Sequence, residues 1–168
     1  MKVIFMDLIR CIYCRSCEVA CEREHDGHSF MSVVLLDERH SIPMNCRHCE
    51  KNPCVAVCPT GALTRLENGP VIIETMKCIG CCLCAMVCPF GILELDYFSK
   101  VMRKCDLCIH RLNEGKLPAC VTTCPARALT YDEFDVIMQR VKDRAAKAII
   151  SGVGFEPGTV VSPPQSNI

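Results

Sequence analysis

The residues of this chain that can do chemistry are its cysteines, which make up 17 of 168 residues. Sixteen of them form four runs, each opening with a C-x2-C pair and closing with a C-x3-C pair. In chain order, the runs contain Cys11, Cys14, Cys17 and Cys21; Cys46, Cys49, Cys54 and Cys58; Cys78, Cys81, Cys84 and Cys88; and Cys105, Cys108, Cys120 and Cys124. A cubane iron–sulfur cluster needs one thiolate on each of its four irons. The sequence therefore predicts four [4Fe-4S] clusters.

Other uses of cysteine fit this pattern less well. A disulfide framework has no reason to repeat gaps of two and three residues, and residues 1–10 lack the features of a secretory signal peptide. Zinc ribbons use two well-separated C-x2-C pairs rather than dense runs of four cysteines. The third run, which ends in Cys88 and Pro89, has the bacterial ferredoxin spacing throughout. His48 and His110 lie beside complete cysteine sets, so we expect surface or capping roles for them.

The runs are expected to cooperate in pairs, because in two-cluster ferredoxins the last cysteine of one run ligates the other run's cluster. Runs two and three are neighbours in the sequence and form the inner pair, which leaves runs one and four as the outer pair. As a hypothesis, the four ligand sets are Cys46, Cys49, Cys54 with Cys88; Cys78, Cys81, Cys84 with Cys58; Cys11, Cys14, Cys17 with Cys124; and Cys105, Cys108, Cys120 with Cys21.

Four further residues beside the runs have two interpretations each. Cys82 is the seventeenth cysteine and is predicted to be a small buried residue, with a reserve ligand as the alternative. Arg10, Lys77 and Lys104 each precede the first cysteine of a run. Such a cation can offset the charge of a cluster and raise its reduction potential, or it can be an ordinary solvated side chain.

The regular elements predicted around the runs are short. Strands are expected at 2–6, 61–64, 71–74, 92–95 and 128–131, and a turn at 68–70 makes the second and third of these a hairpin. The three residues within each closing C-x3-C pair fit a single helical turn. One longer helix is expected after Asp132 as N-cap, because Phe134, Ile137, Met138 and Val141 recur at helical spacing.

These elements predict an α+β fold with two ferredoxin-like di-cluster modules and one longer C-terminal helix. The outer module is expected to combine residues 1–40 with 99–150, and the inner module to span 41–98. Residues 151–168 are rich in glycine and proline, which predicts an extended tail, either disordered or docked on a partner.

Composition excludes several classes of function. Nineteen basic residues balance nineteen acidic ones, which gives no indication of nucleic-acid binding. No apolar run is long enough to span a membrane, so the chain is expected to be soluble, and reduced thiols favour the cytoplasm. Neither a glycine-rich phosphate loop nor a nucleophile elbow is present. We therefore expect no catalysis by the chain itself, only one-electron transfer.

With these runs laid out, the chain resembles the four-cluster electron-transfer subunits of the dimethyl sulfoxide reductase type, a family that also serves formate dehydrogenases, hydrogenases and carbon monoxide dehydrogenases. The resemblance rests on the order of the runs, on the long gap from Cys108 to Cys120, and on Glu22 where proline would follow Cys21. Some relatives replace a third-run cysteine by tryptophan and hold a three-iron cluster. This chain keeps Cys81 and has no tryptophan, so the resemblance implies four [4Fe-4S] clusters.

The chain is expected to lack the membrane-docking extension of longer family members, and it is similar to the compact subunits of tungsten-pterin enzymes, such as aldehyde oxidoreductases and benzoyl-CoA reductase complexes. The resemblance implies a large catalytic subunit with a tungsten- or molybdenum-pterin cofactor, and a second redox subunit or ferredoxin, as partners. A freely diffusing polyferredoxin, a hydrogenase or carbon monoxide dehydrogenase subunit, and an iron–sulfur assembly module are the alternatives.

Overall fold

Two strands far apart in the sequence pair with each other, one at the start of the described chain and one just before its last helix. The computed structural model describes residues 2–36, 38, 41–67 and 69–150. Strand β1 (Lys2–Met6) pairs antiparallel with β8 (Leu129–Glu133), with Lys2 opposite Glu133 and Met6 opposite Leu129. Ile4 and Met6, which alternate along β1, pack against a buried core. Both strands lie close to the predicted positions.

The remaining strands of the described chain form antiparallel hairpins. They pair β2 (Ser32–Leu35) with β3 (Ser41–Met44), β4 (Leu63–Arg65) with β5 (Val71–Ile73), and β6 (Glu94–Asp96) with β7 (Val101–Arg103). The predicted hairpin between runs two and three is confirmed as β4 and β5, although Asn68 of its turn lies outside the described residues. The predicted strand at 92–95 begins two residues later, and β2, β3 and β7 were not predicted.

A short helix contains the first cysteine of each closing C-x3-C pair, and in run one it contains both. These helices are α1 (Ser16–Glu24), α2 (Pro53–Ala56), α3 (Leu83–Val87) and α5 (Ala119–Thr123). Helix α4 (Ile109–Asn113) and the 3-10 turn η1 (Thr75–Lys77) lie between runs or within the long fourth run. The single turn predicted for each closing pair is confirmed for α2, α3 and α5. It was too short for run one, where no proline follows Cys21 and the helix continues to Glu24.

The longer C-terminal helix is confirmed as α6 (Phe134–Ile150), whose Ile137 is buried and which contacts β1 and β8. Asp132 is not its N-cap, because β8 extends to Glu133 and the helix begins at the next residue. The Asp132 carboxylate instead accepts a hydrogen bond from the backbone N–H of Glu133 and pairs with Arg140 at 2.8 Å. No helix in the described ranges has the length and apolar character needed to cross a membrane.

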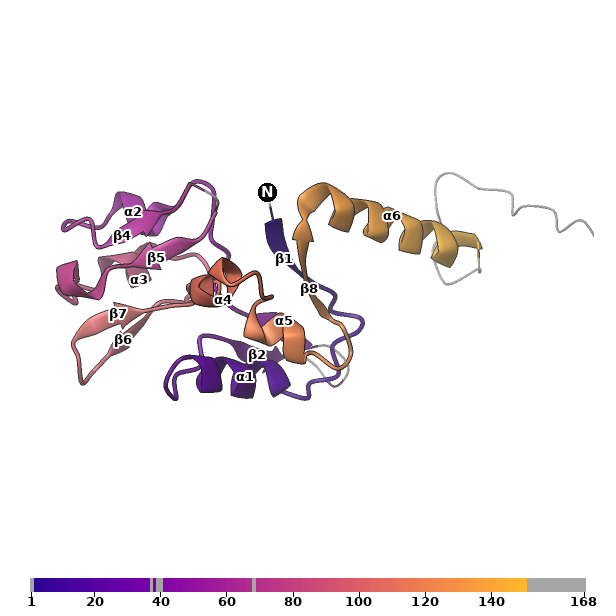
Figure 1. The fold of residues 1–168 in the computed structure, drawn as a ribbon, viewed down its shortest axis with the longest axis horizontal. Coiled ribbons are helices and arrows are strands. Elements are labelled where there is room, and N and C mark those ends of the chain that lie inside the picture. Colours follow the sequence, from indigo (N-terminus) through magenta and orange to yellow (C-terminus); the bar gives the residue numbers. More distant parts are fainter. Residues whose placement is uncertain (1, 37, 39–40, 68, 151–168) are drawn as a thin grey trace, which may run out of the picture.

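Two separate cores organise the molecule (Figure 1). The first gathers Cys17, Cys21, Met31, Val33, Cys120 and Leu129, and the second gathers Leu63, Val71, Cys84, Leu93 and Met102. In Figure 1, β4 to β7 with α2 and α3 form one half of the molecule, while β1, β8, α1 and α5 form the other, with α4 between them. Short antiparallel strand pairs and short helices around two cores confirm the α+β fold class. The predicted tail at 151–168 lies outside the described residues.

Candidate metal centres

The four C-x2-C loops share one backbone feature. The second residue between the two cysteines has a left-handed conformation in every run: φ is 56° at Tyr13, 46° at His48, 66° at Gly80 and 65° at Leu107. This conformation is uncommon for residues other than glycine. Its fourfold recurrence gives the loops the same bend, as expected of segments that wrap the same kind of group. At Gly80 a Cβ atom would lie 2.3 Å from the carbonyl oxygen of Lys100, so glycine is also required for space.

A second repeated turn follows the closing cysteines of runs two, three and four. In each run the backbone N–H three residues after the cysteine donates to the cysteine carbonyl, at 3.2 to 3.3 Å. The donors are Gly61, Gly91 and Arg127, and all three have positive φ. Run one lacks this turn, because Cys21 continues into the last residues of α1. Proline in the turns therefore ends the helix and turns the chain back across the closing cysteine.

The structure brings the outer cysteines together in two groups. Cys11, Cys14, Cys17 and Cys124 line one small cavity. Cys21, Cys105, Cys108 and Cys120 line another. Each group contains the same cysteines as one of the two outer ligand sets predicted from the sequence, whose role as ligands stays a prediction. Helices α1 and α5 position them by packing against each other, and the β1–β8 pair closes the chain around both cavities.

The inner cysteines are gathered around the second core. Cys54, Cys58, Cys78 and Cys88 pack against this core, which contains Cys84. Burial and then the neighbouring Cys78 and Cys81 raise the pKa of the Cys84 thiol to about 11. Burial also raises the pKa of Cys54, and Cys46 adds to the effect. Cys46 and Cys49 line a separate cavity with Arg65.

Burial raises the pKa of several outer thiols, because a buried thiolate needs a counter-charge to be stable. Burial raises the pKa of Cys17 and of Cys108 to about 11, and that of Cys120 to about 12. Burial raises the pKa of Cys105 as well. Iron supplies the positive charge that such buried thiolates need, and metal binding then releases the protons.

Backbone amides point at several of the sulfur atoms. The N–H groups of Phe30, Met102 and Ala128 donate to the Sγ atoms of Cys21, Cys78 and Cys124, at 3.2 to 3.3 Å. In addition, the Leu107 N–H donates to Cys105 Sγ at 3.4 Å. Hydrogen bonds of this kind stabilise thiolate ligands and set the potential of a cluster. The cysteine groups, their burial and these donors together fit [4Fe-4S] clusters.

The two halves meet at Cys105. Cys46 of the second run lies near enough to add to the rise in the Cys105 pKa, after the larger effect of burial. Lys104 is buried at the same place, with 5% of its surface exposed. Its ammonium group donates to the carbonyl oxygen of Val71 and, at 2.8 Å, to that of Cys105. Its positive charge opposes the rise in the pKa values of Cys105 and Cys54, but burial has the larger effect and both values remain raised.

The other two cations that precede a run take ordinary surface roles. Lys77 pairs with Glu74 at 2.7 Å, and more than half of each side chain is exposed. Arg10 lies 3.5 Å from the Asp7 carboxylate and is also exposed. Only Lys104 therefore has the burial needed for a strong effect on cluster charge, because exposed ion pairs are screened by water.

Two cysteines differ from the others by facing solvent. Cys14 and Cys81 are exposed, whereas each of the other fifteen is buried or half-buried. Both are the second cysteine of their run, one in each half. The side chain and backbone of Ser16 donate to Cys14 and lower the pKa of its thiol.

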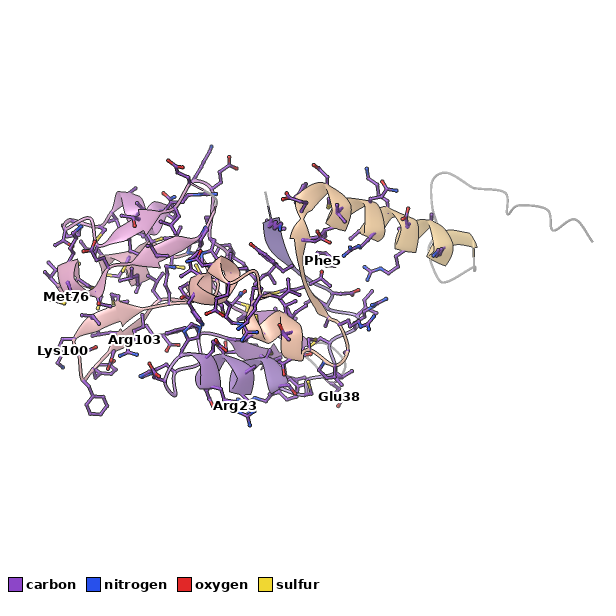
Figure 2. All side chains as sticks on the ribbon, viewed as in Figure 1. Phe5, Arg23, Glu38, Met76, Lys100 and Arg103 are labelled. Atoms are coloured by element: carbon purple, nitrogen blue, oxygen red, sulfur yellow. The ribbon has the colours of Figure 1, made fainter. Side chains whose placement is uncertain are left out.

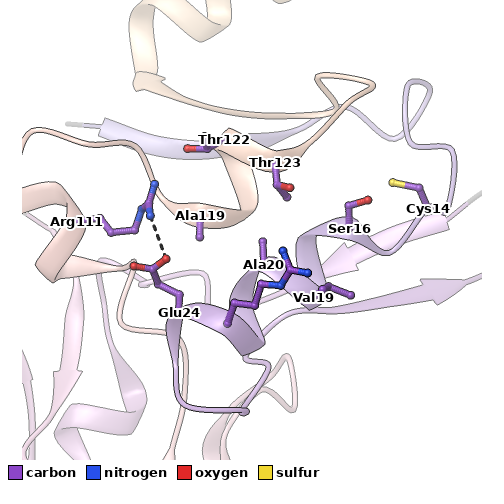
Figure 3. A pocket seen from close by; sticks show the side chains of 10 residues that line it. Cys14, Ser16, Val19, Ala20, Glu24, Arg111, Ala119, Thr122 and Thr123 are labelled. Atoms are coloured by element: carbon purple, nitrogen blue, oxygen red, sulfur yellow. Dashed lines mark hydrogen bonds and ion pairs between the residues drawn. The ribbon is translucent and has the colours of Figure 1, made fainter.

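Cys14 opens into a groove of about 550 Å³ between α1 and α5 (Figure 3). Figure 3 shows Cys14 at one end of the groove, and the ion pair between Glu24 and Arg111, 3.0 Å long, at the other. Ala20, Val19 and Ala119 lie between these ends. The lining is therefore mixed, because the polar residues Ser16, Arg23, Thr122 and Thr123 lie beside these aliphatic side chains.

Three residues within or next to the cysteine runs, namely Cys82, His48 and His110, are not assigned to any ligand set. Cys82 is half-buried and its thiol donates to the Gly80 carbonyl at 3.4 Å, an arrangement that uses the proton a ligand would lose. Of the two roles expected for His48, the structure shows a capping contact in place of a surface position: the side chain is half-buried and its Nδ1 atom accepts a hydrogen bond from the Val71 N–H. Burial, with Lys104 nearby, lowers the His48 pKa to about 3. The expected surface role is right for His110, which pairs with Glu24 at 2.8 Å.

His25 was not identified from the sequence. Its side chain lies beside Asp106 and Cys108, with the ligating atoms of all three within 4.8 Å of one another. Burial lowers its pKa, an effect that Asp106 opposes. More than eighty residues separate His25 from Cys108 in the chain, so no local spacing could have connected them.

Comparison with known proteins agrees with this chemistry. The family described as 4Fe-4S dicluster domain matches residues 37–134. One component of the anaerobic dimethyl sulfoxide reductase of Escherichia coli is 33% identical over 97% of this chain and 88% of its own length. The thiosulfate reductase electron transfer subunit of Salmonella typhi is 40% identical over 79% of this chain and 76% of its own. One component of the sulfite dehydrogenase of Allochromatium vinosum is 33% identical over 92% of this chain and 79% of its own length.

Proposed function

Since the chain belongs to the 4Fe-4S dicluster family and is an iron–sulfur electron-transfer subunit, we propose that its [4Fe-4S] clusters form one path for electrons through the molecule. The observation that carries the proposal is the gathering of the outer cysteines around two cavities. Each cavity is lined by three cysteines of one run and the closing cysteine of the other.

The proposed ligand sets follow from that arrangement. Cys11, Cys14, Cys17 and Cys124 hold the first cluster, and Cys105, Cys108, Cys120 and Cys21 hold the second. The same exchange of closing cysteines gives the inner sets, which are Cys46, Cys49, Cys54 with Cys88, and Cys78, Cys81, Cys84 with Cys58. The proposed modules stay close to the predicted bounds of 1–40 with 99–150 and 41–98, but β3 belongs to the outer module because it pairs with β2, and β7 belongs to the inner module because it pairs with β6. Each cluster accepts and releases single electrons, and the protein sets its potential through burial, hydrogen bonds to sulfur and nearby charge.

The order of the clusters along the path follows from two observations. The nearness of Cys105 to Cys46 supports direct transfer between the halves. Cys14 and Cys81, the exposed cysteines, mark the two ends. Electrons would therefore pass from the Cys14 cluster through the clusters of runs four and two to the Cys81 cluster, or in the reverse direction.

Exposed apolar side chains next to both ends support contacts with other redox proteins. Ile12 beside Cys14 is 66% exposed, and Ile79 beside Cys81 is exposed to the same extent. Met76, which is 91% exposed, and Lys100 lie at the outer edge of the inner half (Figure 2). Large apolar residues left in water mark interaction sites when they gather beside a functional group.

The partner at one end is proposed to be a large catalytic subunit with a molybdenum- or tungsten-pterin cofactor. Relatives named as parts of dimethyl sulfoxide reductase, thiosulfate reductase and sulfite dehydrogenase support this choice. A second redox subunit or ferredoxin is proposed at the other end. The reduced thiols that the clusters need favour the cytoplasm as the compartment.

Purification of the affinity-tagged chain from its native host under anaerobic conditions tests the proposal. We expect the iron of four [4Fe-4S] clusters, a large co-purifying chain, and molybdenum or tungsten in amounts equal to the chain. Iron on a lone small chain would favour a diffusing ferredoxin, and nickel would favour a hydrogenase or carbon monoxide dehydrogenase. Substantially less iron than four clusters require would contradict the proposed ligand sets.

A further inference from the structure

His25 has a place that none of the proposed ligands requires. It follows the last residue of α1, and only 12% of its side chain is exposed. Its Nε2 atom lies 3.7 Å from Cys108 Sγ and 3.6 Å from Asp106 Oδ1. The imidazole is thus directed at a sulfur atom of the second proposed cluster from a separate part of the chain.

The chemistry of the two neighbours decides the role of the Nε2 atom. A carboxylate only accepts hydrogen bonds, and so does the sulfur of a thiolate that binds iron. Asp106 Oδ1 also accepts the backbone N–H of Cys108, at 2.8 Å, which fixes the carboxylate beside the sulfur. With acceptors on both sides, the hydrogen of the imidazole belongs on Nε2, where it can be donated to Cys108 Sγ beside the Asp106 carboxylate.

Aromatic neighbours hold the ring in this orientation. The Phe30 ring packs against the His25 ring with centroids 5.0 Å apart and an interplanar angle of 61°. The His110 ring packs at 5.8 Å and 89°. His110 itself faces outward and pairs with Glu24, so it contacts His25 without reaching the sulfur. A ring fixed from two sides presents its N–H at little cost in conformational entropy.

We propose that His25 is a positioning residue that donates its Nε2 hydrogen to Cys108 Sγ and thereby raises the reduction potential of the cluster held by Cys21, Cys105, Cys108 and Cys120. The inference rests on the proposed function, because it needs Cys108 as a ligand. A hydrogen bond to a ligand sulfur stabilises the reduced cluster, which carries the greater negative charge, more than the oxidised one. His25 would therefore make this cluster easier to reduce than backbone donors alone could.

The test is a redox titration of the full, anaerobically purified chain, followed by electron paramagnetic resonance, with iron counted in every sample. His25→Leu removes the donor at similar size, whereas His25→Gln keeps an N–H near the position of Nε2. We expect one midpoint potential to fall in His25→Leu and to return toward the wild-type value in His25→Gln. His28→Leu is the matched control, because His28 is exposed three residues further along the chain, and it should leave all potentials unchanged.

The outcomes separate this inference from the function on which it rests. Unchanged potentials in a fully loaded His25→Leu protein, or an equal fall in His25→Gln, would overturn the role of His25 and leave the clusters intact. If His25→Leu fails to hold iron, His25→Asn decides by the same criterion, because its amide replaces Nδ1 and does not reach Cys108. A wild-type protein with fewer than four clusters would instead contradict the proposed function.

Discussion

The two halves of the molecule build their cysteine sites in different ways. In the outer half, α1 packs against α5 and β1 pairs with β8, so segments about a hundred residues apart enclose each site. In the inner half, hairpins close in sequence surround the sites. Four outer cysteines are buried, namely Cys17, Cys21, Cys108 and Cys120, whereas Cys84 is the only buried cysteine of the inner half. Contacts distant in sequence therefore shield the outer sites from water more fully than local hairpins shield the inner ones.

The largest expected effect comes from weakening each core in turn. Leu129 of the outer core and Leu63 of the inner core are both 3% exposed, which makes them a matched pair. Replacement by alanine should cost about 2–5 kcal/mol of stability in either case. Leu129 also lines the cavity of the first cluster, so Leu129→Ala should release outer clusters while the inner ones remain. Leu63→Ala should do the reverse.

Iron counts and cluster signals during denaturant titration measure this difference. A Leu129→Ala protein that lost all four clusters together would show that the two halves unfold as one unit. The difference between an outer half held by contacts distant in sequence and an inner half held by hairpins would then have no effect on stability.

The second effect lies at the boundary between the halves. Lys104→Gln removes the buried ammonium that bonds the carbonyl groups of Val71 and Cys105. Loss of these bonds should cost about 1–3 kcal/mol and lower the potential of the clusters nearest to Cys105 and Cys54. Lys77→Gln is the control, since its exposed pair with Glu74 contributes about 1 kcal/mol at most. Chemical denaturation and a redox titration would measure both, and equal effects of the two variants would refute the special place of Lys104.

The smallest effect is expected at Cys82. Its thiol donates to the Gly80 carbonyl and is not needed by any ligand set, so Cys82→Ser should leave iron content and cluster signals unchanged. The adjacent Cys81→Ser should perturb one inner cluster. Loss of iron from the Cys82 variant would make this cysteine a ligand and require a different inner set.

The sequence predicted those parts of the molecule that depend on local patterns. The cysteine runs, the hairpin of β4 and β5, and helix α6 all follow from spacing within a few residues or turns. The extra length of α1 was not predicted, because the missing proline after Cys21 was used only as a feature of the family resemblance. Without proline at that position, nothing stops the helix, and it continues to Glu24. The hairpin of β2 and β3 also lacked a recognised local signal.

Properties that depend on tertiary position could not be predicted. Lys77 and Lys104 both precede a run, yet one is paired in solvent and the other is buried between the halves. His48 and His110 both lie beside cysteines of a run, yet the His48 side chain is half-buried and the His110 side chain is exposed. His25 approaches Cys108 only because α1 and the fourth run fold together. In each case the sequence supplies the side chain, and the packing of distant segments decides what it does.

The most direct test of the central claim is the spectrum of Cys124→Ala. The account predicts that the cluster held by Cys11, Cys14 and Cys17 is lost or reduced to three irons, while the cluster of the fourth run keeps its potential and signal. Cys21→Ala should perturb the fourth-run cluster instead. If Cys124→Ala perturbs the cluster of its own run and leaves that of run one unchanged, the exchange of closing cysteines, and the path built on it, would be contradicted.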